Sequence, residues 1–389
     1  MTVRDLYPGY FALVMATGIC STALLDVGLG RASAALLVVA VVAFVLLFAA
    51  LTWRAIRYRQ QLLADLGAPE KAYAFFTFTA ACNVLAARIL ADGYRTVAIA
   101  LAIVGGLAWL VLSYTIPVRL ILGPRPRPVL AGVNGTWFIW VVGTQSMAVT
   151  WAMLDQPGGA PARIAPLVAV LLWSVGVVLY LVVATLVLTR LLLVEVKPED
   201  LTPPYWVTMG ATAITVLAAA KILGMVPSPP VAATTAVVQG LAVVLWAFGT
   251  WLIPLLVAFG VWRHVLHRIR LEYVPTLWSI VFPLGMYAVA SMELGSVAHL
   301  PIVAGIGRIW TGVALAAWLA VFVGLCITPL KAMMSRPNRP QWRSPQRSRG
   351  LPQKSADLPL LASGEVGDAQ VGFGERLQTF GIDGRVDRA

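Results

Sequence analysis

Ten apolar runs, each about 20 residues long and nearly free of charge, constrain this chain more than any other feature of its sequence. A run of that length can cross the hydrocarbon core of a bilayer as one helix. Only 12% of the 389 residues are charged, whereas about a quarter are charged in a typical soluble domain. A soluble fold cannot bury this much apolar surface, and we therefore predict an all-α polytopic membrane protein. Its ten transmembrane helices are expected at 7–27, 33–52, 72–91, 96–116, 135–154, 164–190, 204–225, 235–260, 276–297 and 309–329.

The loops between these runs differ in positive charge, and the difference predicts the orientation of the chain. Arginine and lysine gather on the cytoplasmic side of membrane proteins. One set of loops offers only Arg31, Arg95, Arg163 and Arg308. The other set carries Arg54, Arg57, Arg59, Lys71, Arg119, Arg125, Arg127, Lys197, Arg263, Arg268 and Arg270. We therefore expect both termini in the cytoplasm and a multi-pass location in the cell (plasma) membrane. No basic segment precedes the first run, which is expected to be a retained span rather than a signal peptide.

The composition changes after Leu330, where a separate segment is predicted. Residues 331–354 hold seven lysines and arginines with no acidic residue, amid proline, serine and glutamine. Residues 357–389 are mixed in charge and rich in glycine. We expect a transmembrane domain at 1–330 followed by a disordered cytoplasmic tail at 331–389. The basic half of this tail is suited to anionic lipid. The alternative is a solubilising tail with no specific partner.

An aromatic residue opens each odd-numbered run, and the regular spacing of these residues indicates an internal repeat. They are Tyr10, Phe75, Trp137, Tyr205 and Trp278. Successive members lie roughly 60 to 75 residues apart, which is the length of two membrane helices with their loops. A small residue followed by threonine recurs at one depth in three of the runs, as Ala16-Thr17, Gly143-Thr144 and Ala211-Thr212. The repeating unit is therefore predicted to be a helical hairpin, present five times in the same orientation.

The odd-numbered runs also hold the small, hydroxyl and amide residues, whereas the even-numbered runs are plainer valine, leucine and alanine. Polar side chains at membrane depth face the protein interior or a water-filled path. We therefore expect five odd helices around a central pore and five even helices outside them. The residues predicted to line the pore are Thr17, Gly18, Asn83, Thr144, Gln145 and Thr212. The alternative is that the small residues only let the helices pack closely.

Four stretches of the odd-numbered runs carry a family resemblance: YPGYFALVMATGIC, VGTQSMAV, PPYWVTMGATAITVLA and LWSIVFPLGMYAVA. They resemble the tellurite-resistance/dicarboxylate transporter family over residues 7–330. That family includes fungal malate permeases, sulfite exporters, the bacterial tellurite-resistance membrane protein and the plant guard-cell slow anion channels. The resemblance implies ten helices in five hairpins around an anion pathway, a homotrimer, and a pore phenylalanine on the ninth helix. That phenylalanine falls on Phe282 here, and the motifs are closer to the malate and sulfite branches than to the plant channels.

Phe282 stands directly before Pro283, inside the ninth run. Proline cannot donate a hydrogen bond to the carbonyl of Ser279, and its ring pushes that turn open, so a kink is expected. A kinked pore helix can turn the side chain at the kink toward the axis, where an apolar constriction gates by dewetting. We therefore expect Phe282 and Pro283 to form a gate. The alternative is a packing phenylalanine beside a proline kink.

Charged residues of the odd-numbered runs are expected near the outer mouth of the pore rather than at its centre. Charges at a mouth concentrate ions by focusing the field, while an uncharged throat binds them weakly enough to release them. Arg88 and Lys221 are the predicted anion-attracting residues, and Glu293 and Asp26 are expected to pair with them. The alternative is interfacial snorkelling with no contact to a transported ion.

The predicted function is transport of small anions through this gated path. A C4-dicarboxylate such as malate, sulfite and small inorganic anions all remain open as substrates. A proton-coupled dicarboxylate symporter is the alternative, with Glu293 as a titratable relay on the gate helix. A membrane-embedded enzyme is a remote alternative, because the chain has no H-E-x-x-H motif, G-x-S-x-G motif or Asp-rich run. The cysteines lie singly, at Cys20, Cys82 and Cys326. We therefore predict no metal or cofactor, and no nucleic-acid partner.

Overall fold

The computed structural model describes residues 3–123, 129–155 and 164–334, and within these ranges every regular element is helical. Within the described residues ten helices are long and apolar enough to cross a membrane, one for each predicted run, so the all-α, ten-span prediction is confirmed. The predicted tail lies outside the described residues from 335 onward. All the described helices belong to one compact unit of the chain, Met1–Arg336.

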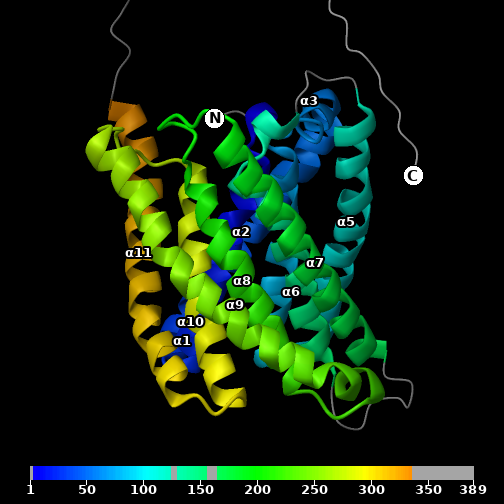
Figure 1. Ribbon diagram of the computed structural model, residues 1–389. Helices are drawn as coiled ribbons and strands as arrows, with labels where there is room; N and C mark the ends of the chain where they lie inside the picture. Colours follow the sequence, from blue (N-terminus) through cyan, green and yellow to red (C-terminus); the bar gives the residue numbers. More distant parts are fainter. Residues whose placement is uncertain (1–2, 124–128, 156–163, 335–389) are drawn as a thin grey trace, which may run out of the picture. The chain divides into compact units, whose positions relative to one another are not determined.

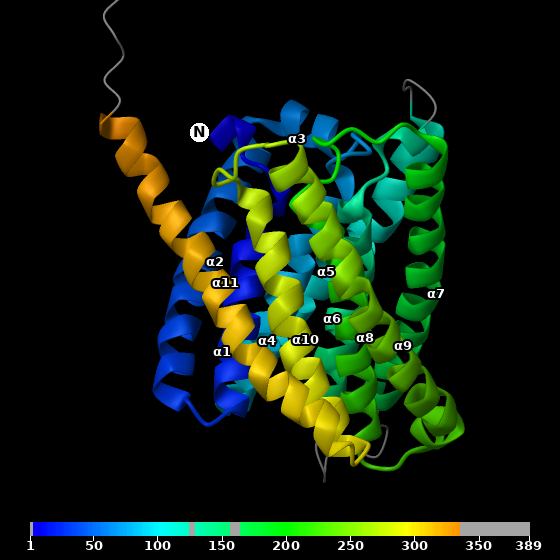
Figure 2. The same cartoon turned by 60° about the vertical axis from the view of Figure 1, so that its left-hand side comes forward.

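The ten spans belong to two classes that differ in burial (Figures 1 and 2). Each inner helix is the first helix of a hairpin, and the spans that contain the inner helices are 72–83% buried. They are α1 (Ala12–Asp26), α4 (Phe76–Ala91), α6 (Phe138–Leu154), α8 (Val207–Leu223) and α10 (Trp278–Val297). The outer helices end the hairpins, and their spans are only 11–39% buried. They are α2 (Gly30–Arg57), α5 (Arg95–Leu122), α7 (Ile164–Leu193), α9 (Pro229–Val261) and α11 (Pro301–Met334).

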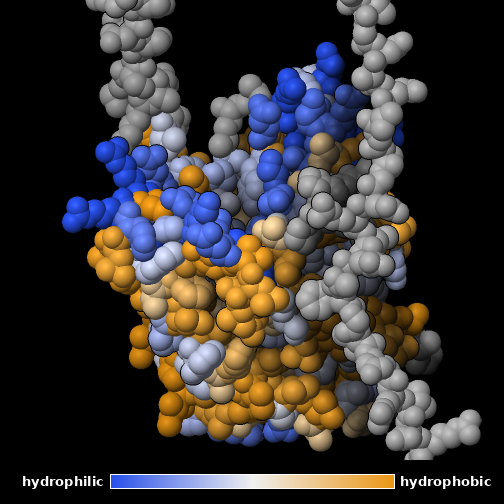
Figure 3. Space-filling model, turned by 45° about the horizontal axis from the view of Figure 1, so that its top comes forward, coloured by the Kyte–Doolittle hydropathy of each residue, from blue (hydrophilic) through white to orange (hydrophobic). Residues whose placement is uncertain are grey.

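The inner helices form a closed ring. Each contacts the next along the chain, in the order α1, α4, α6, α8 and α10, and α10 returns to contact α1. The last outer helix, α11, crosses obliquely over α10 and also reaches α1, which brings the two ends of the repeat together (Figure 2). The large hydrophobic side chains that the outer helices expose are mostly valine, leucine and isoleucine. This surface suits a hydrocarbon solvent, and Figure 3 shows it as a hydrophobic belt below a hydrophilic end.

Each inner helix is preceded by a short 3₁₀ turn, and the repeated aromatic residues lie where that turn becomes an α-helix. The turns are Pro8–Phe11, Ala72–Phe75, Gly135–Trp137, Pro203–Trp206 and Pro275–Leu277. Three of them begin with proline, whose fixed φ suits the first turn and whose missing N–H costs nothing there. The aromatic repeat therefore marks the start of each inner helix.

The outer helices extend beyond the predicted apolar limits. They contain 28 to 34 residues, which is about 42 to 51 Å at 1.5 Å per residue. The final turns of α2, α5 and α7 carry arginines that hydropathy does not count as membrane. Arg54 Nη2 lies 2.5 Å from Asp65 Oδ2 of α3 (Arg59–Asp65), and Arg190 Nη2 lies 3.0 Å from Asp200 Oδ2. These contacts keep the last turns ordered, so the helix continues where the apolar run stops.

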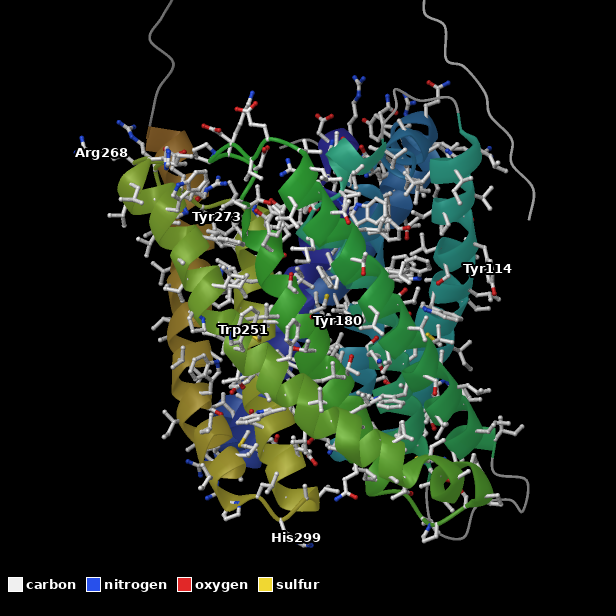
Figure 4. All side chains as sticks on the ribbon, viewed as in Figure 1. Tyr114, Tyr180, Trp251, Arg268, Tyr273 and His299 are labelled. Atoms are coloured by element: carbon white, nitrogen blue, oxygen red, sulfur yellow. The ribbon has the colours of Figure 1, made fainter. Side chains whose placement is uncertain are left out.

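The two ends of the helical unit are marked by Arg268 and His299, which lie at opposite ends in Figure 4. We call them the Arg268 end and the His299 end. All inner helices run from the former to the latter. Gly28, Gly93 and His299 follow inner helices with φ of 80°, 87° and 56°, the left-handed region. In each case the next residue donates its N–H back over a helical turn, as Leu300 does to the Gly295 carbonyl at 2.8 Å. This Schellman pattern turns the chain into the outer helix.

Candidate functional site

A cavity of about 110 Å³ lies inside the inner ring, in its half nearer the His299 end. All five inner helices contribute to its wall. One lining residue from each, in helix order, is Ile19, Asn83, Ser146, Leu217 and Val289. The lining residues come from the middle and the C-terminal part of each helix, because the five helices run in the same direction and in a similar register. The repeat therefore forms a shared compartment on the axis of the ring.

The four charged residues predicted at the mouth all line this cavity: Asp26, Arg88, Lys221 and Glu293. Each comes from a different inner helix. They occupy closely related positions of the repeat, since Asp26 and Arg88 are separated by about one repeat length, and so are Lys221 and Glu293. Closure of the ring brings these positions together although they are far apart in sequence.

Arg88 is only 2% exposed, and its guanidinium is held by neighbouring groups on three sides. Its Nε donates to Ser21 Oγ of α1 at 3.0 Å, and its Nη2 donates to Ser33 Oγ of α2 at 2.9 Å. Its Nη1 lies 2.7 Å from Oδ1 of Asp92, the residue that directly follows α4. A buried charge needs such partners to offset its lost hydration. The two serines thus fix the direction of the cation at the cavity wall.

Lys221 of α8 and Glu293 of α10 form an ion pair across the cavity wall, with Nζ and Oε1 2.5 Å apart. Each side chain is 25% exposed. The pairing expected for these two residues is therefore present. Asp26 lies on the same cavity from α1.

The mouth is not a ring of free cations. With every group ionised, Arg88 and Lys221 supply two positive charges, whereas Asp26, Asp92 and Glu293 supply three negative ones. The C-terminal ends of five parallel inner helices also point toward the His299 end, and helix C-termini carry partial negative charge. In this ionisation state the compartment attracts anions less than the two cations alone would.

Phe282 shares a helix face with the part of α10 that lines the cavity. Met286 and Glu293 line the cavity, and Phe282 precedes them by one and by three helical turns, so all three lie on one face of the helix. One turn separates Phe282 from Met286, about 6 Å at 1.5 Å per residue, in the direction of the Arg268 end. The Phe282 side chain is 1% exposed. It therefore lies on the same face of α10 as Met286 and Glu293, one turn nearer the Arg268 end than the cavity lining.

Glycines hold the neighbouring helices close to α10 around Pro283. A Cβ added at Gly210 of α8 would lie 2.8 Å from Pro283 Cγ. A Cβ added at Gly285 would lie 2.8 Å from Ile19 Cγ2 of α1. Pro283 is inside a continuous helix that spans Trp278–Val297. The proline segment thus packs closely against both of its neighbours in the ring, with the Pro283 ring against Gly210 of α8 and Gly285 against the Ile19 side chain of α1.

The repeated threonines do not face the cavity, and this corrects the predicted row of pore hydroxyls. Thr17 Oγ1 accepts a hydrogen bond from Trp318 Nε1 of α11 at 3.0 Å, and Thr144 Oγ1 accepts one from Trp109 Nε1 of α5 at 2.8 Å. Thr212 Oγ1 lies against Gly249 of α9. All three hydroxyls therefore point at outer helices.

The other three predicted pore residues lie in three different surroundings. Asn83 lines the cavity, and its Nδ2 donates to the Thr79 carbonyl at 2.9 Å. Gln145 points outward and donates from Nε2 to the Trp173 carbonyl of α7 at 3.1 Å. Gly18 gives room to Val84, since an added Cβ would lie 2.8 Å from Val84 Cγ1. The presence of a small residue at Gly18 is therefore explained by close helix packing, which was the alternative to a pore-lining role.

The threonine contacts belong to a pattern that the sequence analysis missed. In four hairpins a tryptophan of the outer helix donates its indole N–H to the inner helix of the following hairpin. The acceptors are Thr144 Oγ1 for Trp109, the Thr215 carbonyl for Trp173, Ser291 Oγ for Trp246 and Thr17 Oγ1 for Trp318. In the first hairpin, Phe44 of α2 instead stacks on Phe78 of α4, with centroids 6.1 Å apart. The signal was the spacing of these tryptophans, which recur about once per repeat length along the chain.

Comparisons with known proteins agree with this architecture. A family model described as "Voltage-dependent anion channel" matches residues 5–326. An uncharacterized membrane protein of Mycobacterium tuberculosis is 55% identical over 161 residues, which cover 41% of this chain and 81% of that protein. An uncharacterized transporter of Methanocaldococcus jannaschii is 24% identical over 328 residues, which cover 79% of this chain and 89% of that protein.

Proposed function

The chain belongs to the voltage-dependent anion channel family, and from this premise we propose that it carries small anions across a membrane through the ring of inner helices. Membership of the family supports anion transport in general. The observation that supports this path is the axial cavity, because all five inner helices line it and Arg88 and Lys221 lie in its wall. A conducting path needs an uncharged throat beyond such a compartment. Phe282 supplies an apolar side chain at that position.

Phe282 is the proposed gate. It is fully buried and lies one turn from the cavity on the same face of α10. A bulky apolar side chain in a narrow path excludes water, and an ion cannot pass without its hydration or a substitute for it. Pro283 sets the backbone geometry beside it, and Gly210 lets α8 support that turn. Opening therefore requires a movement of the Phe282 ring or of the proline segment.

The proposed substrates are small anions: a C4-dicarboxylate such as malate, sulfite, or small inorganic anions. The second candidate is a proton-coupled dicarboxylate symporter, and the position of Glu293 favours it as an alternative. Glu293 is an ionisable residue of the gate helix that lines the cavity and pairs with a lysine. In a symporter each anion would cross with a proton carried on this carboxylate.

Flux into liposomes tests the proposed path. Purified wild-type and Phe282→Ala proteins would be compared against malate, sulfite, chloride and nitrate, with and without a pH gradient. Phe282→Ala should raise basal anion flux because the plug is removed. Phe138→Ala is the matched control: Phe138 is also fully buried, but its ring packs on Tyr180 of outer helix α7, with centroids 5.5 Å apart. A Phe282→Ala protein that folds normally and adds no flux would overturn the gate.

The location, orientation and assembly are also proposals. We propose a plasma-membrane protein with the Arg268 end in the cytoplasm, because basic residues such as Arg54, Arg119 and Arg190 lie in the last turns of outer helices at that end. Membrane-impermeant labelling of a single cysteine placed at His299 should then succeed on intact cells, and labelling at Arg268 should fail. The homotrimer implied by the family resemblance stays a prediction, and cross-linking in native membranes would test it.

A further inference from the structure

We infer that the cavity selects small anions that carry a hydrogen-bond donor of their own, such as a hydroxyl group beside the charged group, over anions that only accept. This inference rests on the proposed anion path and names the substrate class of that same cavity. The cavity volume of about 110 Å³ restricts the class to small anions, because pockets for drug-sized ligands begin at roughly 300 Å³. The class comprises small hydroxycarboxylates, hydroxysulfonates and hydrogen oxyanions.

The hydroxyl groups in the cavity wall already use their protons within their own helices. Thr22 Oγ1 donates to the Gly18 carbonyl at 3.2 Å. Ser146 Oγ donates to the Gly143 carbonyl at 2.7 Å. A carbonyl oxygen can only accept, so in each contact the proton belongs to the hydroxyl group. Thr22 and Ser146 both line the cavity, and their oxygens therefore offer a ligand there only lone pairs, which accept hydrogen bonds.

Asn83 adds a third acceptor to the wall, and this one is unpaired. Its Nδ2 donates to the Thr79 carbonyl at 2.9 Å, and a Cβ added at Gly105 of outer helix α5 would lie 2.8 Å from that nitrogen. Because the nitrogen is turned toward the outer helix, the amide oxygen lies on the other side of the side chain. Asn83 is 1% exposed, and its Oδ1 has no hydrogen-bond partner among the described residues. A buried acceptor without a partner is costly, and a donor on a ligand in the cavity would remove that cost.

The positive charges of the cavity do not distinguish between anions of equal charge and similar size. Arg88 Nη1 lies 2.7 Å from Asp92 Oδ1, and Lys221 Nζ lies 2.5 Å from Glu293 Oε1. The attraction of an anion to these cations depends on its charge and its distance from them. Two matched anions therefore gain nearly the same from it. The difference between them comes from whether the anion can donate to the three acceptors of the wall.

The size of the preference follows from one hydrogen bond. An anion that only accepts leaves the three acceptors to water or without a partner, whereas a hydroxyl group on the anion replaces a water with a direct bond. One hydrogen bond between uncharged groups corresponds to about a fivefold change in a binding constant. We therefore expect about a fivefold preference for the donating anion at concentrations well below saturation.

The test is uptake of two labelled sulfonates into liposomes that contain the purified full-length protein. Hydroxyethanesulfonate and ethanesulfonate have the same charge and differ by one hydroxyl group. Both are anions of strong acids, so neither crosses the lipid as a neutral acid. Potassium with valinomycin carries the counter-charge, and uptake into protein-free liposomes is subtracted. The wild-type protein should take up hydroxyethanesulfonate about fivefold faster than ethanesulfonate.

Variants in the wall test whether its acceptors cause the preference. Thr22→Val keeps the shape of the side chain and removes one acceptor, and Asn83→Leu removes the unpaired one. Each variant should bring the uptake ratio of the two sulfonates closer to one. The matched control is Thr185→Val, because Thr185 makes the same kind of bond within its helix, to the Leu181 carbonyl at 2.9 Å, but is exposed on outer helix α7. This variant should keep the wild-type ratio.

The outcomes separate the preference from the proposed function. Absence of uptake of chloride and of both sulfonates, in the wild type and in Phe282→Ala, would overturn anion transport itself and the preference with it. Uptake of chloride without either sulfonate, or equal uptake of the two sulfonates by the wild type, would overturn the preference and leave transport standing. A wild-type ratio in Thr22→Val, and in Asn83→Leu where that variant folds, would do the same. Loss of the ratio in Thr185→Val would also overturn the preference, since its cause would then lie outside the cavity.

Discussion

The hydrogen bond from Trp318 to Thr17 joins the last hairpin to the first, and we predict that it contributes measurably to stability. The indole Nε1 of α11 lies 3.0 Å from the hydroxyl of α1. Interhelical hydrogen bonds in membrane proteins have coupling energies of about 0.6 kcal/mol on average and about 1.7 kcal/mol at most. Thr17 is 0% exposed, so water does not compete for this hydroxyl. The coupling should therefore lie in the upper part of that range, at about 1 to 1.7 kcal/mol.

A double-mutant cycle measures this coupling. Trp318→Phe removes the donor but also alters packing, because the indole stacks on Phe322 with centroids 4.7 Å apart. Thr17→Val removes the acceptor and keeps the shape of the side chain. The cycle cancels what each single change does alone and leaves the pairwise coupling. The assay is the free energy of unfolding of the wild type, both single variants and the double variant in detergent micelles.

Thr22→Val provides the matched control for this cycle. The Thr22 hydroxyl donates within α1 to the Gly18 carbonyl at 3.2 Å, and Thr22 lines the cavity rather than the face of α1 that meets Trp318. Its coupling to Trp318→Phe should be close to zero. Zero coupling between Trp318 and Thr17, or equal coupling for the two threonines, would refute the assignment of ring closure to this hydrogen bond.

Three further predictions concern backbone, packing and charge. His299→Gly should raise the free energy of unfolding by about 1 kcal/mol, because glycine adopts the left-handed conformation without the clash of a Cβ. Gly210→Ala should lower it by about 1 to 3 kcal/mol by overpacking against α10. Asp200 is partly desolvated, which alone raises the pKa of its carboxyl, but hydrogen bonds from the Lys197 backbone and Arg190 outweigh this and lower the pKa overall. Its stabilising contribution should therefore be present at neutral pH and be lost as the pH falls through the lowered pKa, and Asp200→Asn should remove that part of the acid dependence of thermal stability.

Comparison variants separate these effects from general ones. Gly240→Ala places its Cβ in open space and should leave the stability unchanged or slightly higher. His267→Gly should bring no gain, because His267 has a φ of −96° and needs no glycine. A gain at His267 equal to that at His299 would contradict the backbone explanation. If the thermal stability of Asp200→Asn falls with acid as much as that of the wild type, the contacts of the Asp200 carboxylate do not contribute to the acid dependence.

Hydropathy predicted the ten helices because lipid leaves few other solutions for an apolar run of about 20 residues. The repeat also followed from the sequence, since equivalent aromatic residues recur where each inner helix begins. The lengths of the outer helices did not follow, because their last turns are stabilised by contacts such as that of Arg54 with Asp65. Such contacts depend on loops whose positions a hydropathy profile does not contain.

The sequence predicted that the inner helices exist more readily than it predicted which residues of each helix face the cavity. Thr17 and Thr22 both lie on α1, yet Thr22 lines the cavity and Thr17 meets an outer helix. A threonine in a buried inner helix satisfies its hydroxyl equally well toward either side, so composition does not select the face. The pairing of Lys221 with Glu293 was predictable because both lie at the same end of adjacent inner helices, and the ring brings that end together.

The most direct test of the central claim is the ion selectivity of current through the opened path. Phe282→Ala protein would be placed in a planar bilayer with a salt gradient, and the reversal potential would be measured. Anion transport through the inner ring predicts a reversal potential close to the equilibrium potential of the anion, and a further loss of current when Lys221→Gln is added. A reversal potential that follows the cation, or a current no larger than that of a protein-free bilayer, would contradict the account.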